Sequence, residues 1–463
     1  MTSPPPATGL LPDTVAQWVG ATTGGALISA RQLLTGNRRQ SWIVETDDDG
    51  GRTLFLRMDP VDTDQDDDPF TIRRESRVYQ ALTGAFALIP GLVSVHPTLE
   101  VMLTEHVDGG SSYHALDLPN RIAVGRDFMR ALATLHLLDP VPADFPSSAS
   151  HDGSVASYIR EELSRWEQIY RRTGRDDPLI ELGLEWLLRN VPNVESRPAI
   201  IHGDAGPGNF LFQGDRVTAL VDWEFAHIGD PMEDLAWLSM RSVFEGFEDF
   251  TTRIEEYEAL VGSPVELGRI RFHRVSVQFK VAIIRHRANN DPNPTGDVAN
   301  GLISRVTNRR LLLEALVDAQ GSALPEPTLP EVPPSDQDWV YEATLRMLRN
   351  DVVDRTSDEY VVTKAKSIAR LVKYLRAVDR HGSAFDQLEL NALRSTVGDD
   401  IVDREEGRRR LSALIREGQF DAQALQYLTT ESAIETRLME PALGAIAGRH
   451  LPELPTRRQP VSS

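Results

Sequence analysis

The chain has 463 residues, 41% of them hydrophobic and 25% charged, so it is long enough for two or three domains with well-filled cores. Its net charge of −20 argues against nucleic acid or an anionic membrane surface as a partner, because both are bound by faces rich in lysine and arginine. It contains no cysteine, which excludes disulfides, thiolate catalysis and cysteine-ligated metal sites.

No apolar run approaches the roughly 20 residues needed to cross a bilayer, and the N-terminal sequence lacks the order of a signal peptide. We therefore expect a cytoplasmic protein. Residues 1–330 contain 30 Lys and Arg against 47 Asp and Glu, whereas residues 331–463 contain 19 against 22. The acidity belongs to the first part, where it either attracts a cationic substrate or, more simply, keeps the surface solvated.

The first 110 residues predict a small strand-rich unit. β-branched and aromatic residues between glycine and asparagine turns predict strands, and periodic apolar residues that end at Gly84 predict a helix. A short helix, three antiparallel strands, a second helix and two further apolar segments are expected over residues 14–24, 26–36, 40–46, 53–59, 69–84, 91–97 and 100–110.

From residue 120 the pattern changes to long amphipathic helices, with one β-like island between them. The island covers residues 199–231, where the stretches AII, FLF and TALVDW predict short strands linked by polar turns. Five prolines among residues 323–336 indicate a semi-rigid linker and a domain boundary. The helices before the island are expected over 120–140, 154–172 and 179–191.

Beyond the linker the sequence predicts only helices and no reactive constellation. They are expected over residues 338–353, 359–382, 384–398, 407–418 and 422–443. In the second of them Gly382 stands just past the predicted end, and one apolar stripe is expected to face the core. The stripe consists of Val361, Ala365, Ile368, Val372 and Leu375.

The island contains the sequence HGDAGPGN, with Asp204 and Asn209, and a second carboxylate follows at Asp222. This set suits phosphoryl transfer to a hydroxyl, in which one aspartate takes the hydroxyl proton while an asparagine and an aspartate hold magnesium against nucleotide phosphates. The DxxxxN spacing alone is more simply explained as a glycine-rich turn. The strand-rich unit, Glu75 on the helix after it and the later GDPMEDLAW segment favour the chemistry.

Over roughly residues 25–315 the chain resembles the aminoglycoside and choline kinase-like phosphotransferases, whose catalytic loop reads H-G-D-x-x-x-x-N and is followed by I/V-D-W-E and G-D-P-x-x-D-L-A segments. The resemblance implies an α+β, two-lobed protein-kinase-like fold, with a small antiparallel-sheet N-lobe and a mainly helical C-lobe, followed by a separate all-α domain. The expected segments are an arm with a short helix (1–24), the N-lobe (25–108), the C-lobe with the catalytic loop (109–320), a proline-rich linker (321–335), a helical C-terminal domain (336–455) and a tail (456–463).

The resemblance also implies the catalytic roles. Asp204 becomes the catalytic base, and Asn209 and Asp222 become ligands of Mg²⁺. The phosphate donor is ATP or another nucleoside triphosphate.

The same resemblance assigns supporting roles. His202 is expected to hold the backbone of the loop rather than to transfer protons. Asp230 and Asp234 are expected to fix loops, with Asp234 accepting backbone hydrogen bonds instead of binding metal. Glu224 is either a group behind the metal site or a surface carboxylate.

The segment LLTGNRRQSWIVE occupies the place of the phosphate-covering hairpin, although it has a single glycine where kinases often have several. Backbone amides from Gly36 and Asn37 onward are expected to reach phosphate oxygens. Arg38 or Arg39 adds charge there, or both are simply exposed hairpin arginines. Backbone groups around Glu105 and Val107, in TEHVDGG, are expected to meet the adenine edge.

Arg57 ends the apolar strand LFLRMD, in a chain whose first lysine is Lys280. In kinase-like folds the third strand supplies a cation to the α- and β-phosphates, and a glutamate of the next helix pairs with it. Arg57 with Glu75 is the only plausible pair here, although arginine and lysine are not equivalent. Composition offers an alternative, because 45 of the 49 basic residues are arginine, but it does not explain a charge at the end of an apolar strand.

The acidic run VDTDQDDDP suggests a calcium loop but fails in detail. Counting from Asp62, position six is Asp67 instead of glycine, and position twelve is Arg73 instead of glutamate. We interpret the run as a solvated loop.

Together these observations predict an ATP- and Mg²⁺-dependent small-molecule kinase that phosphorylates a hydroxyl. A kinase portion fused to certain acyl-CoA dehydrogenase-like proteins also carries LR at the third strand, and this similarity favours a hydroxylated metabolite or acyl compound over an aminoglycoside. The alternative is a catalytically silent, nucleotide-binding scaffold whose C-terminal helices bind a protein partner. Those helices also offer a surface for self-association.

Overall fold

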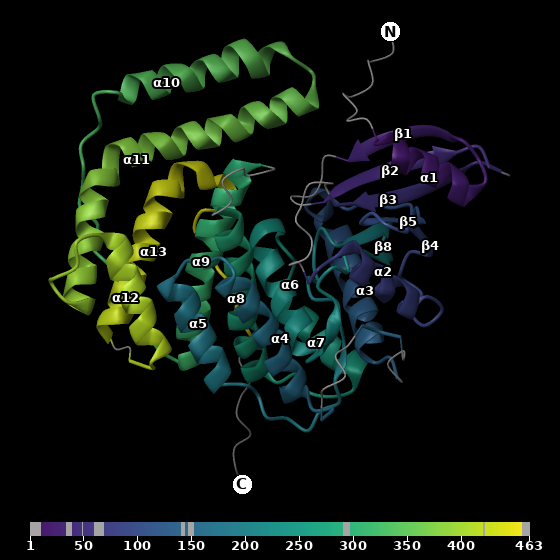
Figure 1. The fold of residues 1–463 in the computed structure, drawn as a ribbon, viewed down its shortest axis with the longest axis horizontal. Helices are drawn as coiled ribbons and strands as arrows, with labels where there is room; N and C mark the ends of the chain where they lie inside the picture. The colour runs from purple at the N-terminus through teal and green to yellow at the C-terminus, as the bar shows by residue number, and fades with distance from the viewer. Residues whose placement is uncertain are drawn as a thin grey trace. The chain divides into compact units, whose positions relative to one another are not determined.

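The computed structural model describes residues 11–33, 39–48, 50–59, 69–139, 144–146, 152–289, 297–419 and 422–455 (Figure 1). The chain divides into two compact units. The first comprises residues 1–158, 194–270 and 451–463, and the second comprises residues 159–193 and 271–450. Among the described residues, no helix is long and apolar enough to cross a membrane.

The first unit begins with a helix and a five-stranded antiparallel sheet (Figure 1). The helix and the first three strands were predicted as such, and the two further apolar segments form the other two strands. The strand order is β1-β2-β3-β5-β4, which places β3 at the centre. In this register Arg57 of β3 is opposite Ser41 on one side and Met102 on the other. The elements are α1 (Asp13–Thr23), β1 (Leu27–Leu33), β2 (Gln40–Thr46), β3 (Arg52–Met58), α2 (Ile72–Leu82), β4 (Leu92–Val95) and β5 (Val101–Glu105).

Alternation along β3 explains how an apolar strand carries a charge. Leu54, Leu56 and Met58 belong to a core cluster that includes Val15 and Val19 of α1. Successive side chains point to opposite faces of a strand, so Arg57 projects from the other face. Helix α2 packs against β4 and β5 and supplies Glu75 from its first turn.

The island between the long helices forms two small antiparallel pairs. Strand β6 (Ala199–Ile201) pairs with β9 (His227–Gly229), and β7 (Phe210–Gln213) pairs with β8 (Arg216–Leu220). Each of the three predicted stretches contains a strand, although β8 ends at Leu220, before the end of TALVDW. Strand β9 was not predicted, because His227–Gly229 contains only one β-branched residue and ends in glycine. The loop that carries the HGDAGPGN motif joins β6 to β7.

Helices complete the first unit around this island. Helix α3 packs against β6 and β8 and contacts α7. The rings of Phe128 in α3 and Phe210 at the start of β7 stack with centroids 4.6 Å apart, which fixes the island against the helix. The helices are α3 (Leu118–His136), α6 (Met232–Glu245) and α7 (Phe250–Val261).

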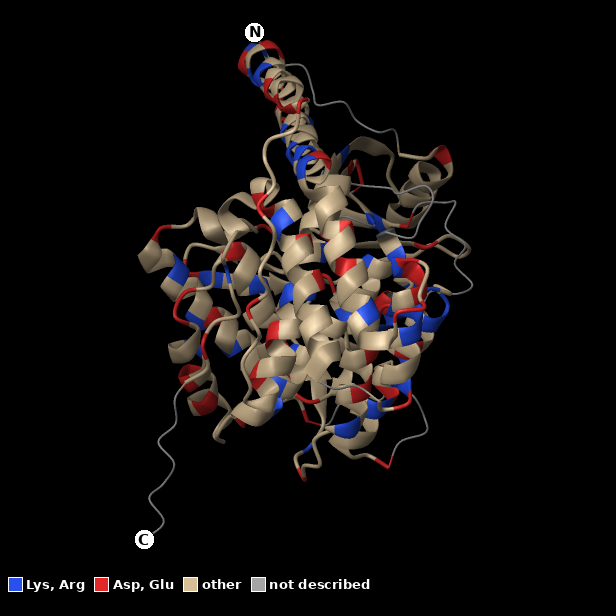
Figure 2. Cartoon of the chain, turned by 90° about the vertical axis from the view of Figure 1, so that its left-hand side faces the viewer, with Lys and Arg blue, Asp and Glu red and all other residues tan. Residues whose placement is uncertain are grey.

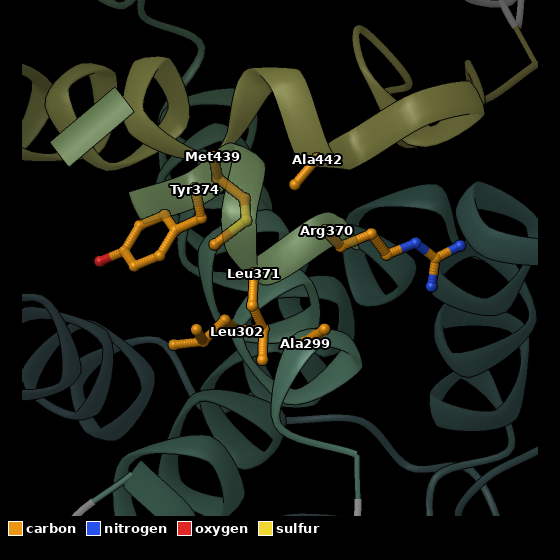
Figure 3. A pocket seen from close by; sticks show the side chains of 7 residues that line it. All are labelled: Ala299, Leu302, Arg370, Leu371, Tyr374, Met439 and Ala442. Atoms are coloured by element: carbon orange, nitrogen blue, oxygen red, sulfur yellow. The ribbon is translucent and has the colours of Figure 1, made fainter. Parts of the chain in front are cut away.

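The second unit is helical. Within it α11, α13 and α9 pack on one another around Ile303, Val306 and Met439. Figure 3 shows side chains from these three helices converging, and the space between them leaves no room for a water molecule, so this is packing and not a binding site. The helices are α4 (Val155–Arg171), α5 (Pro178–Arg189), α8 (Leu267–Asn289), α9 (Val298–Gln320), α10 (Asp338–Met347), α11 (Glu359–Val397), α12 (Arg404–Arg416) and α13 (Ala422–Leu443); α4 and α8 begin in the first unit.

The prediction that a helix ends at Gly382 is wrong, because α11 runs through that residue without a break. The rings of His381 and Phe385 are buried and stack 5.1 Å apart across it. This packing offsets the cost of about 1 kcal/mol for a glycine inside a helix. The predicted apolar stripe is also partly wrong: Ala365 is buried, but Ile368 and Leu375 are about half exposed, at 48% and 52%.

An all-helical region follows the proline-rich linker, as predicted. It shares its compact unit with α5 and α9, because α12 contacts α5 and α13 contacts α9. The domain boundaries expected from the sequence stay predictions. Acidic and basic residues are interspersed along the helices (Figure 2), which agrees with a solvated surface.

Candidate active site

The carboxylate of Asp234 holds the backbone of the loop after β6 in place. Oδ2 of Asp234, on α6, accepts the backbone N–H of His202 at 2.8 Å, and Oδ1 accepts that of Gly203 at 2.9 Å. Nε2 of His136 lies 3.0 Å from Oδ2 of the same carboxylate. Asp234 is fully buried; two of these contacts position the loop backbone, and the third joins Asp234 to the side chain of His136 on α3.

His202 connects the loop to the end of β8. Its Nδ1 accepts the backbone N–H of Asp204 at 3.3 Å, and its Nε2 donates to the carbonyl of Val221 at 3.0 Å. Burial lowers the pKa of this ring, which therefore stays neutral at pH 7. The neutral ring with its proton on Nε2 satisfies both hydrogen bonds, so its role in the structure is support.

Asp204 and Asn209 lie side by side. Nδ2 of Asn209 donates to Oδ2 of Asp204 at 2.7 Å and to the backbone carbonyl of Asp204 at 2.9 Å. Both residues are buried. The backbone N–H of Val221 donates to the carbonyl of Asn209 at 3.0 Å, which holds the segment before Asp222 against the loop.

Asp222 adopts a left-handed backbone conformation with φ 69°, which is uncommon for a residue other than glycine. Its Oδ1 accepts a hydrogen bond from Nη2 of Arg57 at 2.6 Å. Burial opposes ionisation of Asp222, and Arg57 outweighs burial, so the pKa of this carboxyl lies below its usual value. The strained turn thus brings the carboxylate to the sheet of the N-lobe.

Arg57 and Glu75 form an ion pair, with Nη1 of Arg57 3.0 Å from Oε1 of Glu75. Burial alone would lower the pKa of Arg57, but the carboxylates of Asp222 and Glu75 raise it well above its usual value. Nε of Arg57 is buried and has no hydrogen-bond partner in the described part of the chain. The guanidinium of Arg57 is therefore held by two carboxylates, while its buried Nε–H has no acceptor among the described residues.

Arg39 is buried, so the interpretation of the hairpin arginines as exposed is wrong for this residue. Its Nε lies 3.1 Å from Oδ1 of Asp59, and its Nη1 contacts Glu75 and lies 3.2 Å from Oε2 of Glu224. Arg57 is accordingly not the only cation here. The sequence analysis considered Arg39 but did not predict these ion pairs, because the partners are 20 or more residues away along the chain.

Glu224 is not a surface carboxylate, because only 15% of its side chain is exposed. Burial, together with the charge of Asp222, raises the pKa of Glu224 to about 7. Oε2 of Glu224 also lies 4.0 Å from Nη2 of Arg57, the nitrogen that contacts Asp222.

Asp230 lies at the start of α6, where its Oδ1 accepts the backbone N–H of Met232 at 3.0 Å. Nε of Arg269 donates to its Oδ2 at 2.9 Å. Asp230 is fully buried and fixes the turn before α6.

The segment predicted to meet the adenine follows β5. The backbone N–H of Glu105 donates to the carbonyl of Gly91 at 2.8 Å and is therefore occupied. The backbone groups of Val107 have no backbone partner within the described ranges. Gly36, Asn37 and Arg38, and the acidic run from Asp62, lie outside the described residues.

Arg241 is a further charged residue at this site that the sequence reasoning did not select. Its Nε donates to Oδ1 of Asp204 at 2.7 Å, and its Nη2 contacts Oδ2. A signal for it exists, because Arg241 follows Asp234 by seven residues on α6 and therefore projects from the same face, toward the loop. The whole constellation lies within the first unit.

Comparison with known proteins identifies the first part of the chain. The sequence model described as the phosphotransferase enzyme family matches residues 29–271. A solved structure of a candidate aminoglycoside phosphotransferase from Ralstonia eutropha superposes with a TM-score of 0.52 and 21% identity, over 67% of this chain and 99% of that one. The kinase-like fold expected from the motifs is thereby confirmed.

Two curated relatives carry other names. Human acyl-CoA dehydrogenase family member 11 is 31% identical over 149 residues, which are 30% of this chain and 18% of that protein. A probable acyl-CoA dehydrogenase of Arabidopsis thaliana, IBR3, is 29% identical over 264 residues, which are 48% of this chain and 30% of that protein. The matches span less than a third of either relative.

Proposed function

This chain belongs to the phosphotransferase enzyme family, and on that basis we propose that it transfers the γ-phosphate of ATP to a hydroxyl group of a small molecule. One observation carries the proposal: the loop with Asp204 and Asn209 is tied to the strand end before Asp222, and Asp222 contacts Arg57 at 2.6 Å. These contacts support a single site that contains the proposed base, the two proposed metal ligands and the proposed phosphate-binding cation.

Mg²⁺ fits the donors present. Asn209 and Asp222 offer an amide oxygen and a carboxylate oxygen, both hard donors of the kind that Mg²⁺ prefers. Within the described ranges no group of three or more His, Asp or Glu side chains is placed to hold a metal by itself, so nucleotide phosphates and water would supply the other ligands. When bound, the ion would neutralise charge on the transferring phosphoryl group.

The nucleotide phosphates would be met by Arg57, which Glu75 holds in place. Arginine stays protonated and offers a planar fork of donors, so it can serve electrostatically where other kinases use lysine. Backbone groups at Val107 and Glu105 are proposed for the adenine edge, and Gly36 and Asn37 for the phosphates.

Asp204 would accept the proton of the attacking hydroxyl. Asn209 donates to its Oδ2, so the carboxylate is oriented before any acceptor binds. His202, Asp230 and Asp234 hold the backbone of this region and do not touch the reacting atoms in this proposal.

The acceptor is proposed to be a hydroxylated metabolite or a hydroxyacyl compound. Two observations support this class over an aminoglycoside. The relatives named above are acyl-CoA dehydrogenases by description. The guanidinium of Arg241 lies directly against Asp204, where it would repel the ammonium groups of an aminoglycoside.

A scaffold without catalysis is the second candidate. Large apolar side chains are exposed on the C-terminal helices, among them Trp339 at 68% and Met347 at 62%, which favours a protein partner there or self-association. A cytoplasmic location remains part of the proposal.

The test begins with thermal unfolding in ATP and Mg²⁺, followed by a phosphate-transfer screen over hydroxy acids, hydroxyacyl thioesters and aminoglycosides. Asp204→Asn should lower turnover by roughly 10²- to 10⁴-fold and leave nucleotide binding largely intact. Asp215→Asn, in the exposed turn after β7, serves as the matched control. Nucleotide binding without transfer to any acceptor would favour the scaffold, and unchanged turnover in Asp204→Asn would reject the assigned base.

A further inference from the structure

The side chain of Arg241 makes three contacts with the loop that joins β6 to β7. Its side chain leaves α6 and donates from Nε to Oδ1 of Asp204 at 2.7 Å and from Nη2 to Oδ2. Its Nη1 donates to the backbone carbonyl of Pro207 at 3.0 Å. The guanidinium therefore grips the carboxylate through both oxygens and is fixed at its far end by the loop backbone.

The loop is shaped to receive this side chain. Gly206 has φ +144°, and a Cβ added there would lie 3.0 Å from Cβ and Cδ of Arg241. Gly208 has φ +94°, and its added Cβ would lie 3.2 Å from Nη1 of Arg241 and 3.3 Å from Oε1 of Glu245. Side chains at either glycine would press against the arginine, so these two glycines of the motif make its seat.

The seat leaves part of the guanidinium unused. A guanidinium has five N–H donors, and the three contacts above occupy one on each nitrogen. One N–H on Nη1 and one on Nη2 remain without an acceptor among the described residues. The side chain of Arg241 is 23% exposed, whereas that of Asp204 is 11% exposed. Arg241, which has the two remaining N–H donors, is therefore the more accessible residue of the pair.

We propose that Arg241 binds an anionic oxygen group of the acceptor, such as a carboxylate or a phosphate, while it holds Asp204. This inference rests on the proposed function and names the class of acceptor. Two remaining N–H groups on one planar fork match two oxygens of such a group. The hydroxyl to be phosphorylated would then be presented to Asp204 by the same guanidinium that orients the base. Arg241 is thus a specificity-determining residue.

The test compares kcat/KM for an acceptor that carries a carboxylate with kcat/KM for the matching neutral amide. The probes are 2-, 3- and 4-hydroxybutyrate, each paired with its neutral primary amide, with ATP and Mg²⁺ as co-substrates. Wild type should phosphorylate at least one hydroxybutyrate with kcat/KM about tenfold or more above that of its amide. In Arg241→Met this ratio should fall to about 1, because only the acid loses a partner.

Two further variants separate recognition from folding. Arg241→Gln keeps a hydrogen-bond donor for Asp204 without the positive charge. Its ratio of kcat/KM for the acid to kcat/KM for the amide should also fall to about 1, which keeps the test decisive if Arg241→Met does not fold. Arg126→Met is the matched control, because Arg126 is an exposed arginine in an ion pair with Glu256 at 2.8 Å; its ratio should stay that of wild type.

Each outcome decides a different question. Equal turnover of acid and amide by wild type, or a ratio that survives in both Arg241 variants, would overturn the inference. Transfer to neutral or cationic acceptors with none to a hydroxybutyrate would also overturn it while leaving the proposed function intact. Transfer to no acceptor at all would remove the proposed function itself.

Discussion

Arg57 and Asp222 form a partly buried contact of 2.6 Å between Nη2 and Oδ1, across 165 residues of sequence. The contact joins the proposed phosphate-binding cation to a proposed metal ligand. In the absence of nucleotide each charge is balanced by the other, so both side chains stay ionised and in place. The five-stranded sheet and the segment after β8 are thereby linked by two residues that are proposed to contact the nucleotide and its metal ion.

Arg57→Met should raise KM for ATP and lower kcat/KM by about 10²- to 10³-fold, because a cation aimed at the phosphates is lost. Steady-state kinetics with varied ATP provide the measurement. Arg57→Lys keeps the positive charge but loses the planar set of N–H donors, so its kcat/KM should lie between that of wild type and that of Arg57→Met. Equal kcat/KM in wild type and Arg57→Met would mean that this arginine reflects composition alone.

Arg39→Met should damage stability more than Arg57→Met does. Removing Arg39 leaves Asp59 buried without its partner and leaves Glu75 with Arg57 alone, and breaking a buried ion pair in this way costs about 3–5 kcal/mol. Urea unfolding at pH 7 measures the loss. The matched control is Arg52→Met, since Arg52 pairs with Asp48 at an exposed position of the same sheet and should cost less than about 1 kcal/mol. Similar losses in both variants would contradict the buried role of Arg39.

Local sequence could predict that the HGDAGPGN loop and the segment before Asp222 come together, because both lie within one short stretch of the chain. Asp204, Asn209 and Asp222 stand within 19 residues of one another, and the hydrogen bonds that tie them together run between neighbouring turns. The strands and helices of the first unit were predictable for a similar reason: their apolar periods and turn residues agree with the final packing.

Residues whose roles depend on distant partners could not be predicted in this way. Arg39 looks like an exposed hairpin arginine until α2 and the segment after β8 are placed around it. Gly382 carries the signal of a helix end, and only the packing of His381 and Phe385 shows why the helix continues. Tertiary contacts override local signals at both positions.

Gly203→Ala should disrupt the catalytic loop. Gly203 has φ +79°, and an added Cβ would lie 2.4 Å from the carbonyl oxygen of Phe225, so strain and a backbone clash combine. Gly214→Ala is the matched control, because Gly214 has φ +60° and nothing within 4 Å of its added Cβ. We expect Gly214→Ala to cost about 1 kcal/mol with turnover retained. Gly203→Ala should cost more and reduce turnover, and equal effects on thermal unfolding and turnover would count against the clash.

The last prediction concerns a buried ion cluster in the second unit. Nη2 of Arg309 lies 3.0 Å from Oε2 of Glu431, its Nε lies 2.9 Å from Oε2 of Glu435, and its Nη1 contacts Asp177. Burial, partly offset by Arg309, raises the pKa of Glu431 from 4.5 to about 7. The folded protein therefore holds a proton on Glu431 at pH values where the unfolded chain has released it.

The sign of the effect follows from proton linkage. Because the pKa of Glu431 is higher in the folded state, its contribution to the free energy of unfolding is complete below about pH 4.5 and is lost as the pH rises to about 7. Glu431→Gln does not titrate, so between pH 5 and pH 8 wild type should lose about 1–3 kcal/mol relative to this variant. Urea unfolding at several pH values measures the difference. Glu405→Gln, at an exposed position of α12, should follow wild type, and parallel pH profiles for wild type and Glu431→Gln would show that Glu431 is already ionised in the folded protein.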